Sequence, residues 1–249
     1  MTGLLGALQF LTRLPVRLTL PPRPADAVPW FPVVGALIGL IVGGIAAGLG
    51  ELVPAAVAAA VAVLGGVLLT GALHEDGLAD VADAFAGGTT RDERLRILKD
   101  PVHGSYGVAA LSGSITLRIV CVATLAPATA VAGAVAAHAL ARCVMVGTLA
   151  VVPPAGDRGL GAETAAAIDR RRTVYGIGAG AALAAVAVGW WALPIAAAAI
   201  GAAGVVVALA VRKLGGTTGD VLGAVEQVAE CAALVVVTGL ATRHAVWWR

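Results

Sequence analysis

The sequence predicts an all-α fold, a polytopic integral membrane bundle of about seven transmembrane helices preceded by an N-terminal interfacial helix. Of the 249 residues, 59% are hydrophobic and only 13% are charged, whereas soluble domains have roughly 45–50% apolar and about 25% charged residues. The mean hydropathy is +0.92. Apolar stretches of about 20 residues, long enough to cross a bilayer, recur along the chain. No linker divides it, so residues 1–249 are interpreted as a single membrane domain.

The first element is too short to cross a membrane. The apolar segment MTGLLGALQFL is followed by Arg13, Pro15 and Arg17, so we expect a helix that lies along the membrane interface. Longer stretches then qualify as crossing helices, and the first and second, third and fourth, and fifth and sixth are separated by very short turns. Their approximate bounds are 28–50, 52–73, 106–126, 128–152, 173–193, 194–211 and 221–242.

Basic residues precede the first crossing helix and occupy only alternate connections between the others. They are Arg13, Arg17, Arg23, Arg91, Arg94, Arg96, Lys99, Arg158, Arg170, Arg171, Arg172, Arg212 and Lys213. The positive-inside rule assigns these connections to the cytoplasm. We therefore expect a multi-pass protein of the cell (inner) membrane with a cytoplasmic N-terminus and a cytoplasmic working face. The net charge of +2 is too small to indicate nucleic-acid binding.

An acidic stretch, HEDGLADVADAF, follows the second apolar run. Asp76, Asp80 and Asp83 are spaced i, i+4, i+7 and share one face if the helix of 52–73 continues. Like charges on one helix face repel, and a divalent cation would relieve this repulsion. Carboxylate oxygens suit Mg²⁺, Mn²⁺ or Ca²⁺. The alternative is a solvated acidic face paired with basic residues downstream, namely Arg91, Arg94 and Arg96.

Two further segments on the predicted cytoplasmic side have the composition of ligand-binding loops. LKDPVHGSYG contains Lys99 and Asp100 and leads into a crossing helix, although Pro and Gly also mark ordinary turns there. LGGTTGD precedes the last crossing helix, and its backbone amides could bind an anion at the helix N-terminus. The residues concerned are Gly215, Gly216, Thr217 and Gly219. Asp220 is expected to be either a helix cap or a further metal ligand.

Several ionisable residues fall inside predicted crossing helices, where they are costly and usually functional. Glu226 and Glu230 lie in the last helix. Arg118 and Arg142 should face the bundle interior, where either could bind a substrate phosphate or neutralise Glu230. The remaining polar candidates are histidines: His138 is expected to pack or to form hydrogen bonds, and His74 could be a general base, a phosphate contact or a satisfied helix-end residue.

Acids that could bind a metal, a glycine-rich anion site and basic residues on one face together indicate phosphate chemistry. From these residues alone the prediction is Mg²⁺-dependent transfer of a phosphate-linked group at the membrane.

Five segments in order, LQFLTRLPV, FPVVGALIGL, HEDGLADVADAF, LKDPVHGSYG and LGGTTGDVLGA, resemble the cobalamin synthase family over nearly the whole chain. The resemblance implies an integral membrane catalytic domain, Mg²⁺-dependent, that acts late in cobalamin nucleotide-loop assembly. Such an enzyme joins adenosylcobinamide-GDP to α-ribazole or its 5′-phosphate and releases GMP. The DGxxAR pattern of CDP-alcohol phosphotransferases is absent, so their fold is not assumed.

Site residues follow from the resemblance by position. It implies a metal site of Asp76, Asp80, Asp83 and Asp220. It implies catalytic roles for Asp80 and Asp83, with His74 or an adjacent carboxylate as proton acceptor. It implies substrate contacts from Lys99, Asp100 and Arg142, and a phosphate cradle from Gly215, Gly216, Thr217 and Gly219. The segment after Asp100 departs from the family pattern, so no role is assigned to His103.

Two other functions share some of these features. A UbiA-type prenyltransferase also uses aspartates and Mg²⁺, but it would need a second aspartate-rich motif, which is absent here. A corrinoid or cation transporter would need acids along a crossing path, whereas most acids here lie at one end. Beyond the substrates, the expected partner is membrane lipid. Gly35, Gly39 and Gly43 permit close helix pairing, either within one chain or between two copies in a homo-oligomer, and the sequence leaves the oligomeric state open.

Overall fold

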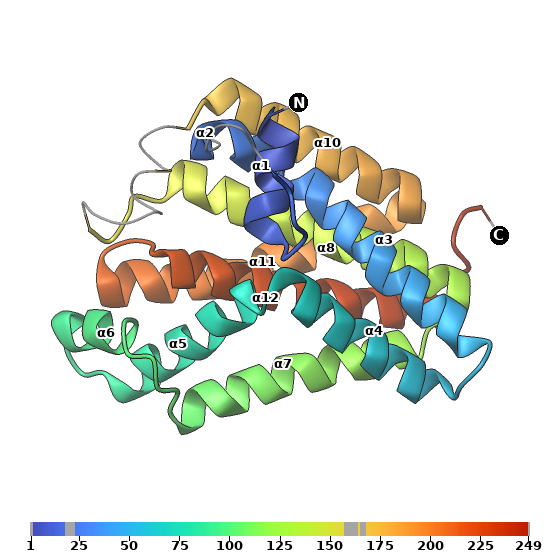
Figure 1. The fold of residues 1–249 in the computed structure, drawn as a ribbon, viewed down its shortest axis with the longest axis horizontal. Coiled ribbons are helices and arrows are strands. Elements are labelled where there is room, and N and C mark those ends of the chain that lie inside the picture. The colour runs from blue at the N-terminus through green and yellow to red at the C-terminus, as the bar shows by residue number, and fades with distance from the viewer. Residues whose placement is uncertain (1, 18–22, 157–163, 165–167, 249) are drawn as a thin grey trace.

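The structure is a computed structural model that describes residues 2–17, 23–156, 164 and 168–248. It is a bundle of helices (Figure 1), and this confirms the predicted fold class. In chain order the elements are α1 (Thr2–Leu11), α2 (Pro24–Ala27), the 3-10 turn η1 (Val28–Trp30), α3 (Phe31–Gly50), α4 (Ala55–Thr70), α5 (Leu73–Gly87), α6 (Arg91–Ile97), α7 (Ser105–Ala123), α8 (Pro127–Val151), α10 (Arg170–Val188), the 3-10 turn η2 (Gly189–Trp191), α11 (Ala192–Leu214) and α12 (Gly219–Ala241). Over the described ranges, β-pairing is limited to one isolated bridge, between Pro154 and Thr217.

Length and hydropathy show a polytopic membrane protein. Five stretches of the described chain could cross a membrane, or six if α4 and α5 together form one broken span. The expected number was about seven. The difference arises because Arg170–Leu214 counts as one stretch, although it contains α10 and α11 separated by η2, and because α4 alone is short.

The second predicted crossing helix does not continue into the acidic stretch. α4 ends at Thr70, and α5 starts at Leu73 at an angle of 88° to it. Gly71 (φ 66°) and Ala72 (φ 57°) at the corner both have left-handed backbones, a conformation that costs a residue with a β-carbon about 1–2 kcal/mol. The three aspartates thus share a helix as expected, but the helix is α5 and not an extension of α4.

The segment after α1 closes this corner from outside. The backbone amide of Arg13 donates to the carbonyl of Leu69 at 2.7 Å, and the Arg13 side chain lies against Gly71. Ala7 and Leu11 of α1 are fully buried. The predicted interfacial helix therefore has an inner face that packs on the protein, next to α2, η1 and α3.

The glycine stripe of α3 packs against α8 within the same chain. A β-carbon on Gly35 or Gly39 would collide with the carbonyl oxygens of His138 or Ala134, and one on Gly43 would lie 2.6 Å from the Cα of Val131. Small residues allow such close contact between membrane helices. Of the two pairings that the stripe permitted, the structure shows the one within the chain.

The connections that contain basic residues and the short turns that lack them lie at opposite ends of the bundle. In Figure 1, α6, the turn between α11 and α12, and the start of α10 lie at one end of the long axis. The α3–α4 and α7–α8 turns and the C-terminal segment lie at the other end. The first end contains the predicted basic connections, of which Arg158 lies outside the described residues.

Candidate functional site

His103 lies between two of the predicted metal ligands. Its Nε2 is 3.4 Å from Oδ1 of Asp76, and its Nδ1 is 3.4 Å from Oδ1 of Asp80. The Asp76 side chain is 63% exposed and the Asp80 side chain 12%. No role was expected for His103 from the sequence, because its loop joins the acidic face through tertiary packing that no local spacing signals.

Asp80 lies in a field of negative charge. α5 lies outside the five stretches that could cross a membrane on their own. Partial burial, followed by the carboxylates of Asp76 and Asp220, raises the pKa of Asp80 to about 6, while His103 acts in the opposite direction. Such mutual repulsion is relieved by a cation. The oxygen donors fit Mg²⁺ or Mn²⁺.

Asp83 has a different set of partners from the other two aspartates. Its Oδ2 accepts a hydrogen bond from the amide of Gly104 at 2.6 Å, and its Oδ1 accepts one from the amide of Gly107 at 2.9 Å. These amides belong to the first turn of α7 and its cap, which have no intrahelical acceptor. Asp83 therefore caps α7 from another helix. The geometry gives no independent support to its predicted roles as metal ligand and catalyst.

The glycine-rich segment is divided between two tasks. Gly215 (φ 83°) ends α11 in a left-handed conformation. The Thr217 amide donates to the Pro153 carbonyl at 2.9 Å, and the Thr217 carbonyl accepts from the Ala155 amide at 2.8 Å. Gly216 packs tightly on the same segment. The Thr217 amide is thus used within the protein and is not offered to an anion.

Only the end of this segment, Gly219 and Asp220, lines a cavity of about 410 Å³. The other polar residues of its lining are His74, Asp76 and Thr164. Its apolar wall comes mainly from α1, α2, η1, α3 and α8, with Leu73 of α5 and Leu222 of α12. α5 and α12 approach each other closely here, because a β-carbon on Gly77 would lie 2.7 Å from the carbonyl oxygen of Asp220. Carboxylates from two distant motifs, Asp76 and Asp220, therefore line one cavity.

Lys99 and Asp100 are exposed and are not part of this lining. Asp100 Oδ1 accepts a hydrogen bond from the Val102 amide at 3.0 Å. This contact closes the turn that leads to His103, so Asp100 shapes the loop beside the acidic face. Substrate contact by Lys99 or Asp100 stays a prediction.

Arg142 lies in a buried network of ion pairs. Its Nη1 is 2.5 Å from Glu226 Oε1 and 3.7 Å from Glu230 Oε2, and only 1% of the residue is exposed. Arg118 joins Glu230 at 3.2 Å and Glu75 at 2.9 Å. The structure thus shows the alternative in which both arginines neutralise buried acids, and it places Arg142 away from any open surface.

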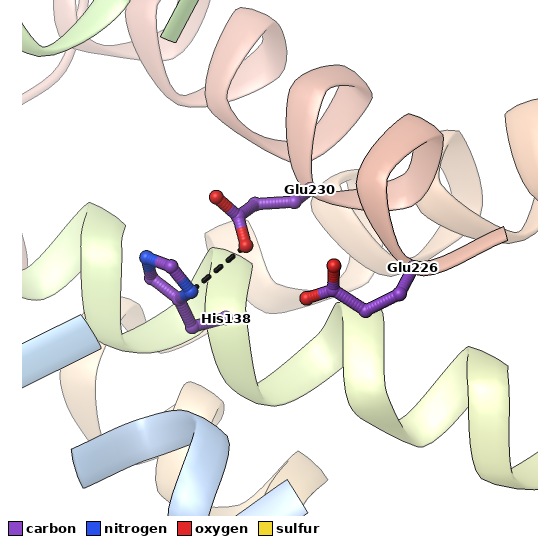
Figure 2. Close-up of side chains that lie close together, drawn as sticks. All are labelled: His138, Glu226 and Glu230. Atoms are coloured by element: carbon purple, nitrogen blue, oxygen red, sulfur yellow. Dashed lines mark ion pairs between the residues drawn. The ribbon is translucent and has the colours of Figure 1, made fainter. Parts of the chain in front are cut away.

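Histidines complete the network on both sides. His138 Nδ1 lies 2.8 Å from Glu230 Oε2 (Figure 2), and His74 Nδ1 lies 3.2 Å from Glu226 Oε2. Within the described ranges, His138, Glu226 and Glu230 are the one group of three whose ligand atoms lie within 4.8 Å of one another. Since the guanidinium of Arg142 already contacts both glutamates, we interpret this group as a buried ion-pair cluster and not as a metal centre.

The basic residues downstream of the acidic face do not pair with it. Arg91 donates to the carbonyls of Leu214 (2.8 Å) and Ala155 (2.5 Å), and Arg94 donates to that of Lys213 (3.5 Å). Arg96 lies 4.0 Å from Glu93. The first two arginines therefore bind free carbonyls at the end of α11, where cations are favoured. This argues against the alternative of an acidic face neutralised by these arginines.

Comparison with known proteins identifies relatives that all belong to one family. The family model described as cobalamin-5-phosphate synthase matches residues 3–238. Proteins named adenosylcobinamide-GDP ribazoletransferase from Chlorobaculum parvum and Chlorobaculum tepidum are each 40% identical to this chain, over 93% of both chains. One from Leptothrix cholodnii is 37% identical over 91% of both chains. No solved structure matches.

Proposed function

The chain belongs to the cobalamin-5-phosphate synthase family, and from this premise we propose that it is an adenosylcobinamide-GDP ribazoletransferase. It joins adenosylcobinamide-GDP to α-ribazole, or to α-ribazole 5′-phosphate, and releases GMP. The names of its relatives support this activity. They do not support the prenyltransferase or the transporter.

One observation of the structure carries the proposal furthest. Asp76 on α5 and Asp220 at the start of α12 line the same cavity. Asp80 and His103 adjoin Asp76 on the same face. Segments that resemble the family in three separate parts of the chain thus meet at a single place, next to a space large enough for a ligand.

We propose Asp76, Asp80 and Asp220 as the residues that would hold a Mg²⁺ ion, with His103 beside them. The mutual repulsion at Asp80 and the oxygen donors fit a hard divalent cation. When bound, such a cation would supply neutralisation of charge on the diphosphate and on the departing GMP.

In the reaction, a hydroxyl oxygen of the ribazole forms a bond to the phosphorus attached to cobinamide, and the bond from that phosphorus to the GMP oxygen breaks. The hydroxyl proton must be accepted by a base. His74 lines the cavity, and Glu226 holds its Nδ1 at 3.2 Å. A carboxylate in this position keeps the proton on Nδ1, so that Nε2 can accept another. His74 therefore remains the proposed general base, with Glu226 as its positioning residue.

We also propose that this end of the bundle is cytoplasmic and that lipid surrounds the rest. The basic connections at this end support the orientation. Lipid contact is supported by the apolar stretch Arg170–Leu214. In its most apolar part only 22% of the residues are buried inside the protein.

The activity is tested with protein purified in detergent, adenosylcobinamide-GDP, α-ribazole and Mg²⁺, by following GMP release. Asp80→Asn is expected to lower kcat by about a hundredfold or more, because it removes charge from the reacting centre. Asp92→Asn is the matched control, since that carboxylate on α6 is 94% exposed and should leave turnover unchanged. Wild-type turnover by Asp80→Asn would exclude Asp80 as an essential residue, and no turnover by the unmodified protein would refute the function itself.

A further inference from the structure

We propose that the 410 Å³ cavity binds the aromatic base of α-ribazole, between α1, α3 and α8. The proposal rests on the function above and adds which substrate this cavity accepts. The motifs of the acidic and glycine-rich segments concern the diphosphate and do not indicate where the base of α-ribazole binds. The cavity wall, which comes mainly from other helices, supplies that information.

An aromatic surface forms part of the wall. Phe10 of α1 and Phe31 of α3 both line the cavity. Their rings are stacked, with centroids 5.3 Å apart and an interplanar angle of 9°. The chain contains only three phenylalanines, so two of them meet at this one place. A stacked pair of rings favours a third flat ring packed against it.

Residues of α8 add a buried, apolar part of the wall. Met145 and Leu149 of α8 line the cavity and are 5% and 7% exposed. Methionine sulfur makes favourable contacts with aromatic rings. A benzimidazole with two methyl groups presents mostly apolar edges and can occupy such a space without leaving many polar atoms unpaired.

The other components of the reaction fit the same space less well. Guanine has polar atoms along most of its edge, and those atoms would lose their hydrogen bonds against this wall. The corrin ring with its amide side chains is several times larger than the cavity. The polar residues His74, Asp76 and Asp220, which line the same cavity, can meet the ribose hydroxyls. The base would then lie in the apolar part and its sugar at the carboxylates.

This assignment also gives α1 a role. Gly6 and Phe10 of α1 line the cavity, and the segment after α1 closes the corner between α4 and α5 through Arg13. The N-terminal helix would therefore be part of the substrate site and not only a membrane attachment.

The first test fills the cavity. Leu149→Trp is expected to lower kcat/KM for α-ribazole by about tenfold or more, since the indole takes the volume of the base, while KM for adenosylcobinamide-GDP stays within about twofold. Val151→Trp is the control, because Val151 lies on the same helix and is 78% exposed. A loss confined to adenosylcobinamide-GDP in Leu149→Trp would overturn the assignment.

The second test compares substrate analogues, so it does not require that a variant with a bulky side chain folds. The α-riboside of unsubstituted benzimidazole lacks two methyl groups, each worth about 0.8 kcal/mol when buried, so its kcat/KM should be about fifteenfold lower. Met145→Ala enlarges the cavity, so ribosides of bases larger than that of α-ribazole should reach kcat/KM values closer to that of α-ribazole itself. Equal kcat/KM for the two ribosides would refute burial of the base.

Photolabelling gives a readout without turnover. An azido-benzimidazole riboside should label α1, α3 or α8, and α-ribazole should protect them, whereas GMP should not. Labelling elsewhere, or protection by GMP alone, would overturn the assignment while GMP release still establishes the function. If detergent or lipid occupies the cavity instead, α-ribazole will not protect it, and the proposal fails.

Discussion

Replacement of Asp83 by asparagine distinguishes two possible roles of this residue, helix cap and metal ligand. In the structure each carboxylate oxygen of Asp83 accepts one hydrogen bond from a backbone amide at the start of α7, at 2.6 and 2.9 Å. Hydrogen bonds to charged groups contribute about 1.5–3 kcal/mol each. Asparagine keeps one acceptor and turns its NH₂ group toward the other amide, so one bond is lost. The expected loss in the free energy of unfolding is about 2–3 kcal/mol.

Thermal unfolding followed by tryptophan fluorescence in detergent measures this loss. For a chain of this size about 1 kcal/mol corresponds to 2–4 °C in Tm, so Asp83→Asn should lower Tm by roughly 5–10 °C. Asp80→Asn is the matched comparison, because loss of its charge relieves repulsion from Asp76 and Asp220; it should keep Tm and lose activity. An unchanged Tm with lost activity in Asp83→Asn would refute the capping argument and favour Asp83 as a ligand.

Three further predictions concern the interior and the orientation. Gly39→Leu should prevent α3 from packing on α8 and yield little monodisperse protein in gel filtration, whereas Gly44→Leu, with open space around it, should behave as wild type. Arg118→Met should remove the cation that pairs with Glu75 and with one oxygen of Glu230 and cost about 3–5 kcal/mol of stability. A Tm within about 2 °C of wild type would contradict this, given the same 2–4 °C per kcal/mol. A reporter fused after the last residue should be active only outside the cytoplasm, and cytoplasmic activity would reverse the proposed orientation.

Composition and hydropathy were sufficient for the fold class, because few charges and repeated apolar stretches of about 20 residues are typical of membrane helix bundles. The corner at Gly71–Ala72 was not predictable in the same way. Gly71 is tolerated inside a helix, and Ala72 is an excellent helix former that the structure holds at φ 57°. Glycine is the usual left-handed cap at a helix end, so Gly71 signals the end of α4. The left-handed backbone of Ala72 has no such local signal, and the segment around Arg13 packs on this corner.

The candidate site could be predicted only in part. Asp76, Asp80 and Asp220 follow from motifs, since those segments stand out from an apolar chain. Arg142 could not be assigned, because its role depends on which residues of α12 lie opposite α8. The position of His103 beside Asp76 and Asp80 could not be predicted for the same reason, because these partners lie on a different helix.

The sharp corner between α4 and α5 has a practical consequence for anyone who interprets inactive variants. His74, Glu75 and Asp76 are consecutive, yet the first joins Glu226, the second joins Arg118, and the third lines the cavity. A disturbance of the buried ion-pair network is therefore separated from the cavity by only one turn of α5. A genetic screen for loss of cobalamin production will return Glu75 and Arg118 alongside the aspartates, and such hits on their own will say nothing about contact with nucleotide.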